Sequence, residues 1–560
     1  MRLLQVQLEE QNMEETSIGD FIARLDDNKS SDVIVKMVEA VESGIEDYHN
    51  SVQRKRAPFF KVTKDLEYSE VAYIGLKAFL GVMCSTHSIT ASNVGVSIGT
   101  DLFIATDRTG DIFSVEENIV KEKASSGIKL LSIIVDSLPT NYFRKEQERI
   151  SLKANPWVIS VSSGFEKLRK DNGDVFSMFT RRMMPLVCEP DPWTNMLDGG
   201  YLSQVAKKVT PLVKRHLHHP APDGDTVLSG INHIQKTPFK VNKSIYGVCK
   251  ELQTIRPKDL KKIFKEDNGK FSEECPIDKE EDSYIWEKED VTKINEKTGK
   301  KKVISTLKFQ DEDSTEKRKS FFQWTARRDL HKKQSSARKS IDNSFSTTLE
   351  VVESLKDFDN LFWGGSLDRR SRVYPSAMTG INLQGADYQK AVVMFSKRLP
   401  IGSDRGVYAI KKTLCNHWGG DNGNGVKTDK LDHSSTESWI DENSRWIIQC
   451  AESPMDNTKW MGADKPLQFL VAATEWRDWC KYWDDNGNYG FMSHLCDPND
   501  ASCSGAQILS AMTRDDIGAM HTNMKANIPV QDLYMAVAKK VDENLRDKFD
   551  NMSQDWLGRS

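Results

Sequence analysis

The chain has 560 residues, of which 38% are hydrophobic and 29% are charged, and its formal net charge is −4 at pH 7. This length gives room for two to four domains with large cores, and the composition is typical of a globular protein. The balanced charge argues against a generally basic nucleic-acid-binding protein. It does not exclude a large enzyme that carries a basic groove within a balanced total.

The nine cysteines are scattered and never form a CxxC pair, which argues against a structural zinc site or a disulfide framework. Reduced thiols in a cytoplasm fit this pattern best. The opening run MRLLQVQLEEQNMEE has too short an apolar stretch for a signal peptide and too many acids for a transit peptide. No apolar run approaches the ~20 residues that a membrane span needs.

The first 120 residues are predicted to be mostly helical, and the run EYSEVAYIGLKAFLGVM, residues 67–83, has apolar residues at helical spacing. The run QRKRAP precedes it and contains Arg54 and Arg56. This basic loop can either insert into a groove or form a solvated connector, and composition alone favours the connector. Farther along, the pair Gly199 and Gly200 predicts a tight turn. The run HLHHP predicts a surface loop rather than a metal site.

The central part of the chain is the most charged. VTKINEKTGKKKVISTLKF alternates around a Lys-Thr-Gly turn and predicts a β-hairpin. The strongly basic stretch 317–339 predicts a helix that either tracks phosphates or presents a solvated face. An amphipathic helix is predicted to follow it and to pack through Phe345, Leu349, Val352 and Leu355. The run GGDNGNG lacks the GKS or GKT ending of a phosphate-binding loop and predicts a flexible loop.

The first candidate for chemistry is the run SLDRRSRVYPS, in which Asp368 and Arg372 are four residues apart. Such a pair alone is usually a structural salt bridge. Further cations and a tyrosine lie close by in the sequence, and guanidinium groups and aromatic rings are suited to bind phosphates and to stack on bases. This segment, with Tyr374 and Lys390, is therefore a candidate nucleotide-binding region.

The second candidate is the run NDASCSGAQILSAMTRDD, which carries Asp500. Residues 489–496 predict a strand, and the small residues after Asp500 let the backbone approach a ligand closely. A carboxylate at a strand end suits Mg²⁺, which binds carboxylates, phosphate oxygens and water. The other interpretation is that Asp500 caps the next helix. That helix is predicted to start a buried face with Ile508, Leu509 and Met512.

The third candidate is the run NIPVQDLYMAVAKKVDENL, which has apolar residues at helical spacing and a proline suited to the first turn. Its tyrosine is Tyr534. Core packing is the simplest interpretation of this side chain from the pattern alone.

These three stretches, in this order, resemble motifs of the single-subunit DNA-directed RNA polymerases of T-odd phages and mitochondria, and the phage members look more similar. DRRSRVYPS is similar to the family's DxxGR motif, DASCSGAQILSAMTRDD to its first catalytic motif, and PVQDLYMAVAKKV to a helix that follows. The segments PWTNMLDGGY, SMFTRRMM and HIQKTPFKVNK also resemble parts of this family. QRKRAP lies where phage members have a basic loop that reads promoter DNA, so the resemblance spans nearly the whole chain.

The resemblance implies template-directed RNA synthesis from NTPs in a bacterial host, by a two-metal mechanism with Mg²⁺. By this resemblance Asp500 is the catalytic aspartate that binds metal, and Ala501 supplies a backbone carbonyl to a metal. Double-stranded promoter DNA and an RNA–DNA hybrid are the expected partners. The residues expected at nucleotide or hybrid are Arg372, Tyr374, Lys390, Lys430 and Tyr534, and those expected at promoter DNA are Arg54 and Arg56.

The sequence also departs from the family pattern. Ser371 stands where the DxxGR motif has glycine, and Ala501 stands where glycine usually follows the catalytic aspartate. The family's later fingers helix and its HDS motif, which carries a second metal-binding aspartate, are not found in the 560 residues. Because two Mg²⁺ ions need more than one carboxylate, we expect that this chain cannot polymerise alone. It is then either truncated or one part of a split enzyme that a second polypeptide completes.

The alternative is a catalytically inactive DNA-binding or regulatory remnant of such a polymerase. For either function the expected fold is mainly α with an α/β palm, in a right-hand polymerase architecture. The expected parts are a promoter-binding domain (1–250), a thumb-like helical region with a charged insertion (251–358), a partial palm (359–515) and the start of the fingers (516–560). An incomplete palm predicts an unpaired sheet edge or an exposed apolar face.

Overall fold

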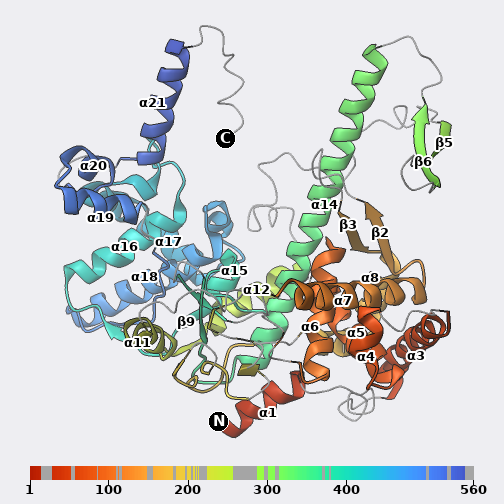
Figure 1. The fold of residues 1–560 in the computed structure, drawn as a ribbon. Helices are drawn as coiled ribbons and strands as arrows, with labels where there is room; N and C mark the ends of the chain where they lie inside the picture. The colour runs from red at the N-terminus through yellow and green to blue at the C-terminus, as the bar shows by residue number, and fades with distance from the viewer. Residues whose placement is uncertain are drawn as a thin grey trace. The chain divides into compact units, whose positions relative to one another are not determined.

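In the computed structural model the chain forms two compact units, Met1–Lys397 and Arg398–Ser560 (Figure 1). Helices predominate in both, as the expected mainly helical fold class requires. None of the described helices is long and apolar enough to cross a membrane. The residues that the structure describes are 1–13, 28–51, 57–84, 86–108, 111, 116–147, 156–180, 184–195, 198–203, 206–207, 210, 212–213, 224–255, 287–294, 301–308, 315–368, 372–376, 380–499, 503–525 and 531–548.

The first half of the first unit is a helical assembly with a small sheet, which confirms the predicted helical start of the chain. The sheet is antiparallel with the order β1-β3-β2, and Ile159 of β3 pairs with both Ile89 and Lys145. The elements are α1 (Arg2–Met13), α3 (Asn28–Ser51), α4 (Pro58–Thr63), α5 (Tyr68–Met83), β1 (Ser88–Thr90), α6 (Ala91–Ala105), α7 (Glu117–Ser137), β2 (Phe143–Gln147), β3 (Trp157–Val161), α8 (Ser163–Asp171) and α9 (Gly173–Thr180).

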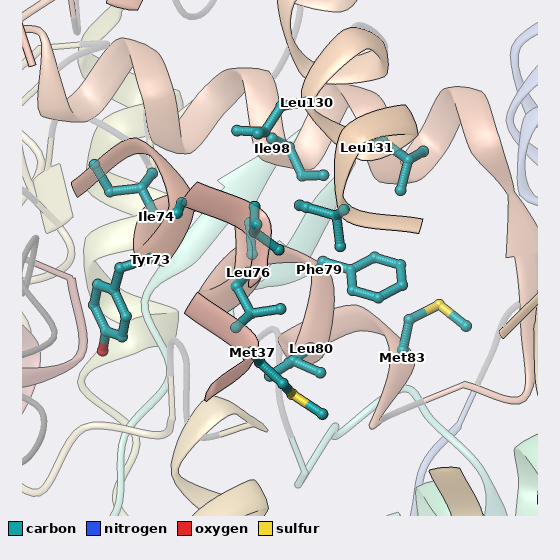
Figure 2. Close-up of a cluster of buried hydrophobic side chains, with 14 of the residues drawn as sticks. Met37, Tyr73, Ile74, Leu76, Phe79, Leu80, Met83, Ile98, Leu130 and Leu131 are labelled. Carbon is teal, nitrogen blue, oxygen red and sulfur yellow. The ribbon is translucent and has the colours of Figure 1, made fainter. Parts of the chain in front are cut away.

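Helix α5 is the centre of this core, and its bounds agree with the predicted helix over residues 67–83. The N–H of Glu67 donates to the Glu70 carboxylate at 3.2 Å, which satisfies a backbone group at the helix start. The helix is apolar on nearly every side, a pattern typical of a fully buried helix. Figure 2 shows Leu76, Phe79 and Leu80 of this helix among side chains from neighbouring helices, and all three are fully buried.

Helices α6 and α7 approach each other closely because glycines lie where they cross. A Cβ atom at Gly127 would lie 1.8 Å from the carbonyl oxygen of Gly95 and 2.5 Å from the nitrogen of Gly99. Close-packed backbone cannot absorb such a contact without moving. We therefore expect Gly127→Ala to lower the free energy of unfolding by about 1–3 kcal/mol, measured by urea denaturation.

The matched control is Gly230→Ala in helix α11 (Gly224–Gln235), where an added Cβ would meet nothing within 4 Å. Alanine there is expected to be neutral or to stabilise the helix by about 0.5–1 kcal/mol. Equal effects of the two substitutions would contradict the close approach of α6 and α7.

The second half of the first unit combines short strand pairs with one long helix. Strand β4 pairs antiparallel with β9, and β7 pairs antiparallel with β8. Strands β5 and β6 also pair antiparallel, which confirms the hairpin predicted there. The elements after α11 are β4 (Phe239–Val241), α12 (Lys243–Ile255), β5 (Glu287–Ile294), β6 (Lys301–Lys308), α14 (Thr315–Leu355), β7 (Gly365–Leu367), β8 (Val373–Pro375), α15 (Asp387–Ala391) and β9 (Val393–Phe395).

The predicted basic helix and the predicted amphipathic helix are one continuous helix, α14, drawn in green in Figure 1. Its C-terminal half packs through Phe345, Leu349, Val352 and Leu355, as expected. The ring of Tyr388 on α15 packs edge-on against Phe345 with 5.1 Å between centroids, and its hydroxyl donates to Ser344 at 2.9 Å. Phosphate tracking by the basic half stays a prediction.

The predicted turn at Gly199 and Gly200 is confirmed. Both glycines have positive φ, and Gly200 forms a bridge with Asp191. A Cβ at Gly199 would lie 2.5 Å from the side chain of Trp193, so only glycine allows this close approach. The run HLHHP lies outside the described residues.

In the second unit three helices, α16, α17 and α18, surround an aromatic core. Trp418 and Trp446 pack with Phe469 at centroid distances of 5.4 and 5.8 Å. Trp460 is fully buried, and its Nε1–H donates to the carbonyl of Pro454 at 2.7 Å. The elements are β10 (Leu399–Pro400), α16 (Asp404–Trp418), η3 (Thr428–Lys430), α17 (His433–Glu452), η4 (Thr458–Gly462), α18 (Pro466–Asn486), β11 (Met492–Ser493), α19 (Ser504–Thr513), α20 (Asp516–His521) and α21 (Leu533–Lys548).

Two local predictions in this unit need correction. The strand predicted over residues 489–496 is only the short β11, paired with β10, because side chains rather than a strand ladder hold the residues after it. The glycine-rich run is a loop, as predicted, but it is not held loosely. The Asp421 carboxylate accepts hydrogen bonds from the N–H groups of Gly423 and Gly425. The side-chain oxygen of Asn422 accepts from the N–H groups of Asn424 and Val426.

The division into two units falls inside the predicted palm. The four-part division into promoter-binding domain, thumb, palm and fingers therefore stays a prediction.

Candidate active site

The predicted catalytic pair, Asp500 and Ala501, lies outside the described residues, as do the predicted promoter contacts Arg54 and Arg56. The structure does describe both flanks of the catalytic run. Residues up to Asn499 lead into it, and residues from Cys503 lead out of it into α19. These flanks show how the second unit holds the segment that carries the candidate aspartate.

The N-terminal flank is fixed to α18 and to the segment before α16. The Glu475 carboxylate accepts from the N–H of His494 at 3.1 Å, and Arg398 Nε donates to His494 Nε2 at 2.7 Å. Burial raises the pKa of Glu475, and its hydrogen bonds with Ser493 and His494 offset only part of that effect. A half-buried acid therefore holds the start of the segment.

The raised pKa of Glu475 predicts that ionisation of this side chain lowers the stability of the fold. The unfolded chain loses this proton first, near the ordinary pKa of about 4.3, so stability falls as pH rises between the unfolded and folded values. At pH 7 we expect Glu475→Gln, which keeps an oxygen acceptor, to be as stable as the parent or up to about 1 kcal/mol more stable. The difference should disappear near about pH 3.5, where both states are protonated.

Thermal unfolding at the two pH values measures this effect. Glu442→Gln on an exposed part of α17 is the control, and it should leave the unfolding temperature unchanged at both pH values. A loss of stability on Glu475→Gln that is larger at pH 7 than in acid would show that the sign is wrong.

The same segment is fixed a second time through Asp497. Its Oδ1 lies 3.3 Å from His417 Nε2, and its Oδ2 lies 3.1 Å from the hydroxyl of Thr413. Burial alone would raise the pKa of Asp497, but the contacts with His417, Thr413 and Asn499 together lower it. For an acid with a lowered pKa, the stabilisation is present above the unfolded value of about 3.9 and is lost only as pH falls through the lower folded value.

The C-terminal flank begins with an unusual backbone conformation. Cys503 has a φ of 61°, in the left-handed region that residues other than glycine rarely adopt, and α19 starts at Ser504. A hydrogen bond with Cys503 raises the pKa of Tyr534 on α21. The structure thus brings Tyr534 to the turn that follows Asp500, although the side chain is 71% exposed. The core-packing interpretation of Tyr534 is wrong for the described residues.

The predicted buried face of α19 is also wrong. Ile508, Leu509 and Met512 are each more than 60% exposed. The helix turns its polar side toward α20, where Ser510 is buried and Gln507 donates to the carbonyl of Thr522 at 2.7 Å. Further exposed apolar side chains lie on α20 and α21, at Ile517, Met535, Val537 and Val541. Among the described residues nothing covers these side chains, and exposed apolar surface of this kind marks contact sites.

In the first unit the hairpin β7–β8 presents the predicted nucleotide-binding residues. The N–H of Arg372 donates to Asp368 Oδ1 at 3.0 Å, and the Asp368 N–H donates back to the Arg372 carbonyl. The hydroxyl of Tyr374 lies 3.4 Å from Asp368 Oδ2. Asp368 therefore closes the loop instead of forming the expected salt bridge through the Arg372 side chain, and it leaves Arg372 and Tyr374 exposed.

The two candidate lysines lie on separate short elements. Lys390 is half-buried on α15 in the first unit. Lys430 is exposed on η3 in the second unit, with its Nζ 3.4 Å from Asp429. The structure thus joins Arg372 with Tyr374 and places Tyr534 at the turn after Asp500.

The described residues do not form a metal site by themselves, since none of them make a group of three or more His, Cys, Asp or Glu side chains suited to a metal. The donors expected from the family resemblance, the carboxylate of Asp500 and the carbonyl of Ala501, are oxygen ligands of the kind that Mg²⁺ prefers. One carboxylate does not satisfy two such ions.

Sequence reasoning missed His417, Asp497 and Glu475. The only signal was the turn-forming pair Asp497–Pro498 just before Asp500. Nothing in the sequence around His417 or Glu475 indicates that either side chain reaches this segment.

Comparisons with known proteins agree with these motifs. A family model described as DNA-dependent RNA polymerase matches residues 400–558, which lie within the second unit. The chain is 24% identical to T7 RNA polymerase of Escherichia phage T7, over 93% of this chain and 59% of that protein. It is 26% identical to a DNA-directed RNA polymerase of Enterobacteria phage K11, over 77% of this chain and 43% of that protein.

A mitochondrial DNA-directed RNA polymerase of Neurospora crassa is 26% identical over 66% of this chain and 23% of that protein. The chain therefore spans about half the length of the phage relatives, 59% of one and 43% of the other. The similarity to them is long enough to reach into both described units. Residues 400–558 thus match the DNA-dependent RNA polymerase family, and most of the chain is similar to single-subunit, phage-type RNA polymerases.

Proposed function

We propose that this chain carries the promoter-binding part and the first catalytic motif of a DNA-directed RNA polymerase that transcribes phage genes. The single observation that carries the proposal is the DASCSG run, which lies in the region matched by the polymerase family model and is preceded by a fixed segment. The right-hand architecture of thumb, palm and fingers belongs to the same proposal.

Residues of this chain would divide the work of nucleotidyl transfer. Asp500 and Ala501 would hold Mg²⁺, which when bound supplies charge stabilisation for attack by an RNA 3′-hydroxyl and for the departing pyrophosphate. The cationic side chains Arg372, Lys390 and Lys430 would offset charge on the phosphates. Tyr374 would stack on template or hybrid, and Tyr534 would lie beside the incoming nucleotide.

At the upstream end Arg54 and Arg56 would contact promoter DNA. Such contacts with phosphates or groove edges weaken as salt concentration rises, because binding releases counterions. The proposed partners are promoter DNA, the RNA–DNA hybrid and the four NTPs.

We propose that a further polypeptide segment completes the site, either as a continuation of this chain or as a second polypeptide. Two observations support this. The 560 residues supply one candidate metal-binding aspartate where two ions need more. The exposed apolar side chains of α19 and α21 also offer a surface for such a segment to cover, and Met512 and Tyr534 are the most exposed of them.

The test is RNA synthesis on tailed or single-stranded DNA with Mg²⁺ and all four NTPs. The chain is assayed alone and then with a polypeptide that carries an HDS motif. We expect RNA synthesis only in the mixture. Synthesis by the chain alone would overturn the need for a further segment. If neither assay yields RNA but the chain binds DNA in a salt-sensitive way, the alternative of an inactive DNA-binding remnant is favoured.

A further inference from the structure

The segment that leads into Asp500 is held by side chains that take no part in the proposed chemistry. Glu475 of α18 and Arg398 hold it at His494, and two side chains of α16 hold it at Asp497. The second contact lies nearer to Asp500 and involves a buried histidine. It is therefore the contact with the greater influence on where the aspartate lies.

His417 and Thr413 are one helical turn apart, so both side chains project from the same face of α16. His417 is 1% exposed, and in the described part of the chain neither its Nδ1 nor its Nε2 makes a hydrogen bond with good geometry. Its Nε2 lies 3.3 Å from Asp497 Oδ1, slightly longer than the usual hydrogen bond, and this carboxylate is the polar group that the ring faces. Burying a polar ring without a well-formed hydrogen bond costs free energy that burying an apolar residue would not.

The contact is also well placed along the chain. Asp500 is three positions after Asp497 in the chain, so their Cα atoms lie at most about 11 Å apart. On the other side Cys503 holds a left-handed conformation and α19 begins at once. Only residues 498–502 connect these two points. A shift of Asp497 would therefore pass directly to Asp500.

We propose that His417, assisted by Thr413, is a positioning residue that acts through Asp497 to fix the place of Asp500. The inference rests on the proposed function, because it assigns these residues to the same site. Residues that orient a metal ligand without touching the metal typically change activity by about 10- to 100-fold when they are lost. His417 thus affects turnover and not the binding of NTP.

The first experiment measures the contact itself by hydrogen exchange of the full chain. His417→Ala is expected to speed exchange of the amides in residues 494–499, while amides of α17 stay at the parent rate. His417→Gln, whose amide reaches about as far as Nε2, is expected to restore protection at least in part. The matched control is His433→Ala at the exposed start of α17, which should leave these amides unchanged.

Because His417 is buried, its loss could unfold α16 as well. Thr413→Val keeps the shape of the side chain and removes only the hydroxyl next to Asp497. It should speed exchange of residues 494–499 by a smaller factor with α16 intact. No change in either variant would overturn the contact between α16 and this segment.

The second experiment measures RNA synthesis in the complete, active mixture described above. His417→Ala should lower kcat by about 10- to 100-fold and leave KM for NTP within about twofold, with partial recovery in His417→Gln. Faster exchange without any change in kcat would overturn the positioning role. If the parent mixture makes no RNA, the proposed function fails, while the hydrogen-exchange result still decides whether His417 holds the segment.

Discussion

Asp500→Ala is expected to lower RNA synthesis by about 10³- to 10⁴-fold, because a metal ion and its ligand contribute several kcal/mol of transition-state stabilisation. The loss should appear in kcat, since the aspartate would act on the reacting phosphoryl group and not on the NTP base. The measurement is the rate of nucleotide incorporation on a tailed template, in the mixture that makes RNA. DNA binding by the variant should stay at the parent level.

The control for this variant is Asp485→Ala, which removes an exposed carboxylate near the end of α18 in the same unit. It should retain full activity. Equal activity of Asp500→Ala and the parent would remove Asp500 from the catalytic site and with it the interpretation of the DASCSG run as the first catalytic motif.

Trp460→Ala is expected to destabilise the second unit by about 3–5 kcal/mol, the cost typical of emptying a large buried site. The indole is fully buried, and its removal also leaves the Pro454 carbonyl without its donor. Since whole domains are commonly stable by only about 5–15 kcal/mol, this loss is a large share of the total. Hydrogen exchange should then rise in α17 and α18.

Trp483→Ala provides the control within the same unit, because Trp483 is 39% exposed on α18. Its effect should stay below that of Trp460→Ala by more than about 1 kcal/mol. A similar loss from both substitutions would mean that the core lies elsewhere in the unit. Peptides of the first unit serve as an internal reference in the same experiment.

The parts of the fold that sequence predicted well are those in which local pattern and burial agree. Helix α5 is apolar on nearly every side and is capped by Glu67, so its sequence pattern and its burial both indicate a core helix. The hairpin β5–β6 and the turn at Gly199 and Gly200 follow from turn chemistry within a few residues. No long-range contact was needed to find them.

The candidate site was predicted less well because long-range contacts decide its geometry. Apolar residues at helical spacing imply a buried face, yet Ile508 and Met512 are exposed because α19 packs on α20 through its small polar side. The strand expected after Tyr489 is short because Glu475 and His417, distant in sequence, hold the following residues through side chains. A local sequence pattern does not predict contacts with residues so far away in the chain.

The loop at residues 420–427 has a practical consequence for labelling this protein. Its ends meet at the bridge between Asp421 and Lys427, and an added Cβ at Gly423 or Gly425 would meet nothing within 4 Å. Lengthening a surface loop whose ends already meet costs little, because closure entropy grows slowly with length. A short dye-acceptor peptide inserted after Gly423 would interrupt the hydrogen bonds from Asp421 and Asn422 to the loop amides beyond it but would leave the aromatic core untouched, and it would provide a site for a fluorescent label on the second unit.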